Sequence, residues 1–101
     1  MAKVSAVQRD LKRRRLAKKH GNKRAALKAI IMNKKSTVEE RFAASMELAE
    51  LPKNSARIRQ RNRCALTGRP RGVHRKFRLS RIAIRDLASR GELPGITKSS
   101  W

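Results

Sequence analysis

Residues 57–85 read RIRQRNRCALTGRPRGVHRKFRLSRIAIR, and the rest of the chain is best understood from this stretch outward. Lys or Arg fills eleven of its 29 positions, and the stretch contains no Asp or Glu. Like charges at this density repel one another and raise the free energy of a compact chain. A polyanion has to neutralise them, and a phosphate backbone has the chemistry to do so. We therefore predict that this segment binds nucleic acid.

The first part of the stretch has arginine at every second position, at Arg57, Arg59, Arg61 and Arg63. In an extended chain this period places all four guanidinium groups on one side. Arg suits phosphate better than Lys does, because its planar guanidinium can donate two hydrogen bonds to one phosphate group. The alternative is a solvated, disordered basic tail. Such tails are usually low in complexity, whereas this stretch has Cys, Leu, Phe and Gly-Arg-Pro at distinct places.

Composition limits how much of the chain can fold alone. The 101 residues suffice for one domain, and 28 Lys and Arg against seven acids give a net charge of +21. Leu, Ile, Val and Phe total only 21 residues. This is close to the composition of chains that stay unfolded on their own. We expect little independent core, with much of the order supplied by the negatively charged partner.

The single cysteine, Cys64, excludes an intramolecular disulfide and indicates a reducing compartment. The basic N-terminus is followed by no apolar run of signal-peptide length, and no stretch has the length of a membrane span. We expect a soluble cytoplasmic chain, or an organellar one whose presequence is missing.

Residues 2–32 have the apolar spacing of a helix, with Val4, Val7 and Leu11 three and four residues apart. Gly21-Asn22 is expected to break or bend this helix. Between the apolar positions, basic residues that include Lys12, Arg13 and Arg14 cover more than one face. Few acids compensate them, which favours a helix laid along RNA over a free amphipathic helix. Docking of the apolar residues on a partner protein is a third possibility.

A second helix is predicted over residues 37–50. Ser36 followed by Glu39 has the capping-box spacing, and Pro52 stops the helix. Val38, Phe42 and Met46 form an apolar stripe that we expect to pack against the preceding helix. Four of the seven acids lie in this segment, which makes it the least suited to contact RNA.

Gly and Pro mark a tight turn with exposed backbone at residues 67–72. Residues 73–79 are expected to form a short strand or half hairpin. Ser80 should cap a last helix that ends at Gly91, with Arg81 and Arg85 outward and with Ile84, Leu87 and Ala88 inward. The predicted fold class is mainly α with extended, irregular basic segments, a small knuckle-like turn and a C-terminal helix. Residues 1–52 would form an N-terminal helical extension and residues 53–101 an RNA-binding module.

The spacing of Cys64, Thr67, Ser80 and Ala83 is close to that of the paired knuckles of a Cys₄ zinc site, but only the first is a thiol. Neither histidine has a partner at ligand spacing. We predict no metal and no other cofactor, and a small buried side chain at Cys64.

Several motifs together resemble one family. They are Arg61-Asn62-Arg63-Cys64, Thr67-Gly68-Arg69-Pro70-Arg71-Gly72, Arg75-Lys76-Phe77, Leu79-Ser80-Arg81, Leu93-Pro94-Gly95 and Lys98-Ser99-Ser100-Trp101. Their order and spacing are similar to those of the family of the fourteenth protein of the bacterial small ribosomal subunit. Family members that bind zinc have cysteines at the positions of 64, 67, 80 and 83. The present sequence resembles the longer, zinc-free branch, in which packing by Cys64, Leu66, Phe77, Leu79 and Ala83 and a Ser80 hydrogen bond would replace the metal.

The resemblance implies a structural protein of the 30S subunit head, bound to the 3′ domain of 16S ribosomal RNA. It also implies a role in subunit assembly and in the conformation of the A site. Contacts with the third and tenth small-subunit proteins, and with the nineteenth as a further candidate, belong to the same expectation. It implies no enzymatic activity, small-molecule substrate or membrane.

From charge and resemblance together, we predict that basic residues of every segment bind RNA. The predicted residues are Lys12, Arg13, Arg14, Arg57, Arg59, Arg61, Arg63, Arg69, Arg71, Arg75, Lys76, Arg78, Arg81, Arg85, Lys98 and Trp101. For Phe77 and Trp101 the sequence leaves open whether the ring stacks on a base or packs on protein.

A DNA-compacting or regulatory protein is the alternative function that the charge allows. The sequence shows no helix-turn-helix, zinc finger or basic leucine zipper, which disfavours it. An enzyme is disfavoured too, because no paired carboxylates lie near a nucleophile and no phosphate-binding glycine loop is present.

Overall fold

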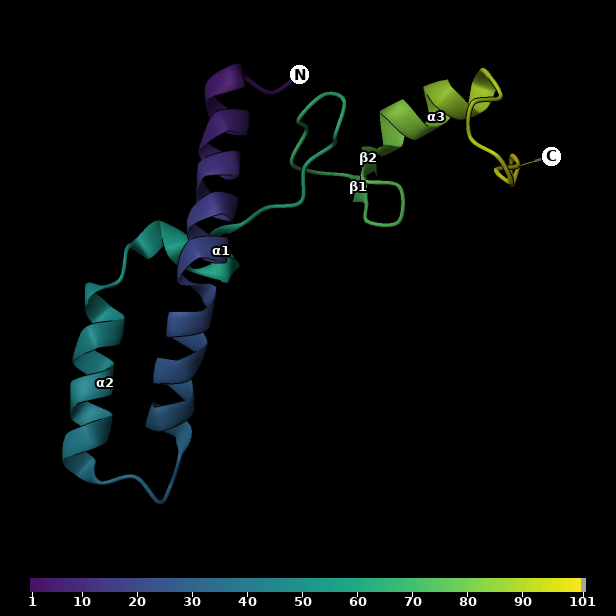
Figure 1. Cartoon of the computed structure of the whole chain (residues 1–101). Helices are drawn as coiled ribbons and strands as arrows, with labels where there is room; N and C mark the ends of the chain where they lie inside the picture. The colour runs from purple at the N-terminus through teal and green to yellow at the C-terminus, as the bar shows by residue number, and fades with distance from the viewer. Residues whose placement is uncertain (101) are drawn as a thin grey trace. The chain divides into compact units, whose positions relative to one another are not determined.

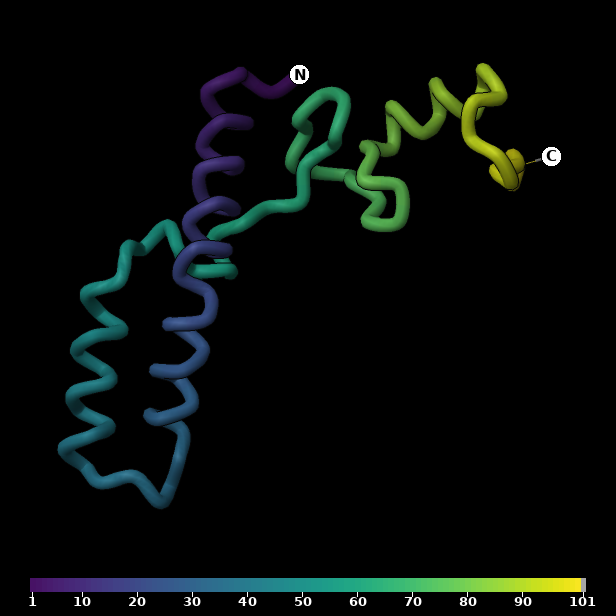
Figure 2. Tube along the Cα trace, viewed as in Figure 1, coloured from purple at the N-terminus to yellow at the C-terminus, as the bar shows by residue number. Residues whose placement is uncertain are grey.

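The computed structural model describes residues 1–100, and the chain folds as two compact units (Figure 1). One unit is Gln8–Gln60, and the other is Met1–Val7 with the described part of Arg61–Trp101. Figure 2 traces the chain through its elements. In order, these are α1 (Val4–Met32), α2 (Val38–Glu50), the short 3₁₀ helices η1 (Lys53–Ser55) and η2 (Arg57–Arg59), β1 (Val73–His74), β2 (Leu79–Ser80) and α3 (Arg81–Ser89).

The predicted fold class is confirmed. Three α-helices and one small antiparallel strand pair account for the regular structure of residues 1–100, and irregular basic segments connect them. The buried apolar side chains of this part are Leu27, Ala44, Cys64 and Ala83. Such a small set provides little hydrophobic stabilisation, so the expectation of a minor independent core is also confirmed.

The α1 helix continues through Gly21-Asn22, so the predicted break is wrong. Ala, Lys, Arg and Leu surround the glycine, and all of them favour helix. A single internal Gly costs about 1 kcal/mol relative to Ala, which is too little to interrupt a helix with such neighbours.

A reciprocal capping box starts α2, one residue later than predicted. The N–H of Glu40 donates to Thr37 Oγ1 over 3.3 Å, and the N–H of Thr37 donates to Glu40 Oε2 over 3.2 Å. Ser36 belongs to the preceding turn, where its N–H donates to the carbonyl of Asn33. The helix ends before Pro52, as predicted.

The face of α2 that turns inward also differs from the prediction. Val38, Phe42 and Met46 are 74%, 67% and 53% exposed, whereas Ala44 is buried and Leu48 half-buried. The short turn that enters α2 determines this orientation, since it sets which side of the helix meets α1. The apolar stripe at intervals of four therefore faces solvent.

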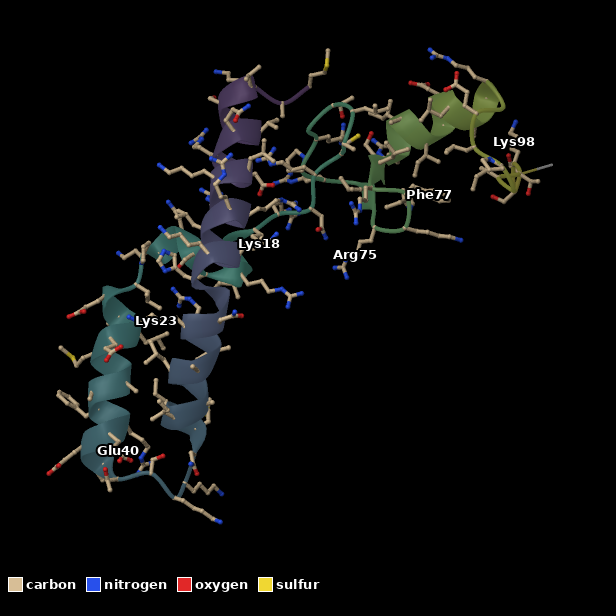
Figure 3. All side chains as sticks on the ribbon, viewed as in Figure 1. Lys18, Lys23, Glu40, Arg75, Phe77 and Lys98 are labelled. Atoms are coloured by element: carbon tan, nitrogen blue, oxygen red, sulfur yellow. The ribbon has the colours of Figure 1, made fainter. Side chains whose placement is uncertain are left out.

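The second half of α1 and α2 lie side by side as a helical hairpin (Figure 1). An ion pair of 3.6 Å joins Lys23 Nζ on α1 to Glu47 Oε2 on α2, and Figure 3 labels Lys23. Both partners are more than half exposed, so the pair adds little stability. The α2 helix packs beside its predecessor as expected, but through small side chains.

The strands and α3 match the sequence prediction closely. β1 and β2 pair antiparallel, with Val73 opposite Ser80 and His74 opposite Leu79. Ser80 is the N-cap of α3, and its Oγ accepts from the N–H of Ala83 over 3.2 Å. At the other end, Gly91 has a φ of 74°, and the N–H groups of Gly91 and Glu92 donate to the carbonyls of Ala88 and Leu87. This is a Schellman termination, which a glycine in the left-handed region permits.

As predicted, Ile84, Leu87 and Ala88 of α3 are at least half-buried, and Arg81 and Arg85 are exposed. Within residues 1–100, no helix has both the length and the apolar content needed to cross a lipid bilayer.

The capping box yields a first testable prediction. Thr37→Ala removes the side-chain oxygen that accepts the N–H of Glu40, and it should lower the stability of the helical hairpin by about 1 kcal/mol. Ser36→Ala is the matched control and should change stability by less than about 0.5 kcal/mol. Urea unfolding followed by far-UV circular dichroism measures both. Equal losses for the two variants would contradict the position of the cap.

Candidate nucleic-acid interface

The centre of the predicted site is a tight turn that backbone hydrogen bonds hold closed. The N–H of Cys64 donates to the carbonyl of Arg69 over 3.0 Å, and the N–H of Gly68 donates to the carbonyl of Cys64 over 2.9 Å. Gly68 has a φ of 74°, and a Cβ there would lie 2.8 Å from Val7 Cγ2. Only glycine fits this conformation and this close approach.

Two further hydrogen bonds tie this turn and α3 to the β1–β2 hairpin. The N–H of Ala65 donates to the carbonyl of Arg78 over 2.9 Å, and the N–H of Arg81 donates to the carbonyl of Gly72 over 2.8 Å. Turn, hairpin and helix therefore form one framework. Arg78 has a φ of 55°, and among residues 1–100 it is the one non-glycine with positive φ. An arginine pays a steric cost there that glycine would avoid.

Three of the predicted arginines support the framework from inside. Arg61 Nε donates to the carbonyl of Pro70 over 3.1 Å, Arg63 Nη1 to that of Gly68 over 2.9 Å, and Arg69 Nε to that of Arg71 over 3.0 Å. The turn has more carbonyls than N–H partners, and guanidinium groups satisfy the remainder. These arginines shape the turn as well as charging it.

The other predicted cations of this unit point outward. Within the described residues, none of them makes a side-chain hydrogen bond or ion pair with the protein, and all are exposed: Arg71, Arg75, Lys76, Arg78, Arg81 and Arg85. Figure 3 shows Arg75 and Phe77 on the loop between the strands. Phe77 is half-buried, and Lys76 Nζ lies 5.7 Å from the centroid of its ring. This geometry is that of a cation–π contact.

The unit contains two cavities beside these cations. One, of about 400 Å³, has apolar lining from Ala2, Pro70 and Ile82, with Arg69 and Arg71 at its edge. The other, of about 510 Å³, lies between α3 and the C-terminal tail. It brings together three predicted residues that are far apart in sequence, namely Arg81, Arg85 and Lys98. The remaining predicted residue of this region, Trp101, lies outside the described residues.

The other unit holds the remaining predicted residues, and one expectation there is wrong. Arg57 and Arg59 lie in η2, where the N–H groups of Arg59 and Gln60 donate to the carbonyls of Ala56 and Arg57. The chain is therefore not extended there, and the four alternating arginines do not form one row. The 3₁₀ turn wins because it pairs backbone groups locally, which an isolated extended chain cannot do.

Lys12, Arg13 and Arg14 lie on α1, as predicted. Arg14 Nε pairs with Asp10 Oδ2 over 2.7 Å, and Asp10 is only 4% exposed. Part of the charge of Arg14 is thus neutralised within the protein, while Lys12 is exposed and Arg13 half-buried.

The Cys64 thiol lies inside the turn, 3% exposed, which confirms the prediction of a buried side chain. Burial raises the pKa of this thiol, but hydrogen bonds oppose it and prevail. They come from the Thr67 hydroxyl and from the backbone N–H groups of Thr67, Ser80 and Leu66, and they lower the pKa to about 6. Leu66 itself is 65% exposed, so its predicted packing role is wrong.

Comparison with known proteins identifies the family. A family model described as ribosomal protein S14p/S29e matches residues 47–100. The small ribosomal subunit protein uS14 of Maricaulis maris is 63% identical over 101 residues, which cover the whole of both chains. The uS14 proteins of Bartonella bacilliformis and Mesorhizobium japonicum are each 58% identical over the same full length. The chain belongs to the ribosomal protein S14 family. The resemblance inferred from the sequence motifs is therefore confirmed, and a place in a ribonucleoprotein and in translation follows from it.

In this member of the S14 family, the cluster at residues 64, 67, 80 and 83 does not fit a zinc ion. A structural zinc needs four ligands. Here one thiol faces hydrogen-bond donors, Ser80 Oγ caps α3, and Ala83 has no side-chain donor atom. Within residues 1–100, no three His, Cys, Asp or Glu side chains come together as a metal site would require. Hydrogen bonds to the thiol stand where a metal would otherwise join the turn to α3.

The sequence interpretation missed one basic cluster of this S14 protein. Lys18, Arg24 and Lys28 of α1 lie beside Arg57 around a groove of about 590 Å³. A signal was present, because small residues recur at Ala17, Gly21 and Ala25 between these cations. It was obscured because Gly21 was interpreted as a helix breaker.

The Cys64 environment makes stability depend on pH. The pKa of the thiol is about 6 in the folded turn, against an ordinary value of 9.0. Folding is then favoured by the thiolate above pH 9, and this contribution is lost as the pH falls through 6. Between these values the free energy of unfolding should rise by up to about 1.4 kcal/mol per pH unit.

Urea unfolding of the full chain at several pH values between 6 and 9 measures this slope, and Cys64→Ala should flatten it. The difference between the two proteins removes the contribution of other titrating groups. Equal slopes in wild type and variant would show that the thiolate is not stabilised in the fold.

Proposed function

We propose that this chain is a structural constituent of the small (30S) ribosomal subunit that binds 16S ribosomal RNA in the subunit head. Its S14 relatives are named as small ribosomal subunit proteins, and no catalytic constellation argues for turnover. The observation that carries the proposal is the outward set of unpaired cations on a hydrogen-bonded framework, in a stretch without a single acid. The ribosome of the cytoplasm is its place of action.

The proposed mechanism is electrostatic clamping. Folded RNA brings phosphates of distant segments close together, and cations held between them reduce their repulsion. The framework holds Arg71, Arg75 and Arg78 on separate loops, so they can reach different strands. Because each phosphate contact releases counterions, affinity should fall steeply with salt. Such clamping would support subunit assembly and the conformation of the A site.

The 400 Å³ cavity adds a candidate contact for a base. Its apolar lining and the arginines at its edge suit an unstacked base whose phosphate lies outside. Phe77 offers a second surface of this kind on the hairpin loop. The exposed basic residues of α1, η2 and the tail complete the proposed set of RNA contacts, with Arg61, Arg63 and Arg69 as both framework and charge.

Neighbouring ribosomal proteins are the proposed partners of the apolar surface. Val38, Phe42 and Met46 of α2 and Ile58 are largely exposed, and such side chains gather where proteins dock. Their acidic surroundings make RNA an unsuitable partner for α2. The third and tenth small-subunit proteins are the first candidates and the nineteenth is the next. In this proposal residues 1–52 act as the extension and residues 53–101 as the main RNA-binding module.

Removing outward cations tests the proposal. Arg71→Ala combined with Arg75→Ala should lower the salt dependence of 16S RNA binding by about 0.7–0.9 in log–log slope for each lost contact. Neither side chain takes part in the framework, so the fold should persist. Filter binding at several salt concentrations and incorporation into reconstituted subunits are the measurements.

Lys34→Ala combined with Lys35→Ala is the matched control. It removes the same charge from an exposed turn of the other unit. If both double variants bind and incorporate equally well, general charge is responsible and the proposed site is wrong.

Arg78 allows a test in which stability and binding move in opposite directions. Arg78→Gly relieves the left-handed backbone and should raise the free energy of unfolding by about 1 kcal/mol, while RNA affinity falls. Arg78→Lys keeps the charge and the strain, and it should retain most of the affinity. A glycine variant that binds RNA as tightly as wild type would remove Arg78 from the interface.

A further inference from the structure

A second basic surface lies wholly within the unit Gln8–Gln60. Here α1 and the η1–η2 segment enclose the groove of about 590 Å³. Half of its ten lining residues are cations, and none is an acid. The cations are Arg14, Lys18, Arg24, Lys28 and Arg57.

Hydrogen bonds build one wall of this groove. Arg24 Nη2 donates to Ser55 Oγ over 2.8 Å and to the carbonyl of Pro52 over 3.4 Å. Ser55 is 2% exposed, and its own hydroxyl donates to the carbonyl of Pro52. The η1 turn is thus tied to α1, which makes the groove a defined feature of the fold.

The floor of the groove is the backbone of α1. Ala17, Gly21 and Ala25 are four residues apart, so they share one helix face. A Cβ at Gly21 would meet nothing within 4 Å. Glycine destabilises a helix relative to alanine, and nothing inside the protein needs the space. The open floor is explained if a molecule outside the chain approaches the helix closely.

The charges around the groove require an anion. The acids of this unit that face α1 are already engaged, since Asp10 pairs with Arg14 and Glu47 with Lys23. Lys18, which Figure 3 labels on α1, Lys28 and Arg57 are exposed, and within the described residues they have no acidic partner. Their mutual repulsion falls only when negative charge enters the groove.

We propose that this groove binds the sugar–phosphate backbone of one RNA strand, with phosphates on Lys18, Lys28 and Arg57 and the backbone passing over Gly21. The inference rests on the proposed RNA-binding function and adds a second, separate surface to it. The lining has no aromatic side chain, so the groove recognises backbone and not base identity. An acidic protein segment fits less well, because protein interfaces centre on large apolar side chains and this lining has none.

Filling the floor tests the inference without changing charge. Gly21→Leu in the full chain should weaken binding of transcribed 16S RNA about tenfold and flatten its salt dependence by about one to three phosphate contacts, at 0.7–0.9 in slope for each. Helix content should rise, because Leu favours helix over Gly. A loss of binding therefore cannot be ascribed to unfolding.

Ala26→Leu is the matched control. Ala26 is exposed on the same helix and does not line the groove, so its enlargement should leave affinity within about twofold. Lys18→Gln combined with Lys28→Gln should reduce the salt slope by about two contacts, whereas Lys34→Gln combined with Lys35→Gln should not.

The outcomes separate this inference from the proposed function. If Gly21→Leu and the Lys18/Lys28 variant bind 16S RNA as wild type does, the groove is not an RNA site, although the chain still binds RNA. If wild type does not bind 16S RNA at all, both ideas are overturned. Synthetic polyglutamate that displaces RNA from wild type but does not bind Gly21→Leu would assign the groove to an acidic protein instead.

Discussion

Electrostatic repulsion among 28 basic residues is the constraint on which the rest of the structure depends. With seven acids and very few buried apolar side chains, the chain cannot offset a charge of +21 by burial. It therefore orders itself locally, through helices, turns and hydrogen-bonded caps that need few long-range apolar contacts. Each compact unit is held together in this way, and the surplus charge stays at the surface where a polyanion can reach it.

Arginine serves two purposes in this arrangement. In the turn around Cys64, the guanidinium groups of Arg61 and Arg63 satisfy backbone carbonyls that have no other partner. On the hairpin loop, Arg75 and its neighbours project into solvent with no internal bond. The first group gives the loops a defined shape, so the second group is held in position before a ligand arrives. Such preorganisation reduces the entropy lost on binding.

The few acids are used where they neutralise or cap. Asp10 is buried against Arg14, and Glu40 closes the capping box of α2. Their concentration on α2 separates a helix suited to protein contact from the basic surfaces. An S14 protein of this kind thus sorts its surface by partner, with cations on the knuckle and α1 and exposed apolar side chains on α2.

Charge, caps and turns were determined by the sequence alone, because each depends on residues close together in the chain. The short hairpin, the Ser80 cap, the Gly91 termination and the burial of Cys64 were all predictable on these grounds. The tertiary structure decided which face of α2 meets α1, and that Arg57 and Arg59 lie in a 3₁₀ turn. It also revealed the groove over Gly21, since its walls come from segments about thirty residues apart. A local pattern cannot specify such features, because the same spacing is compatible with several packings and only long-range contacts select one.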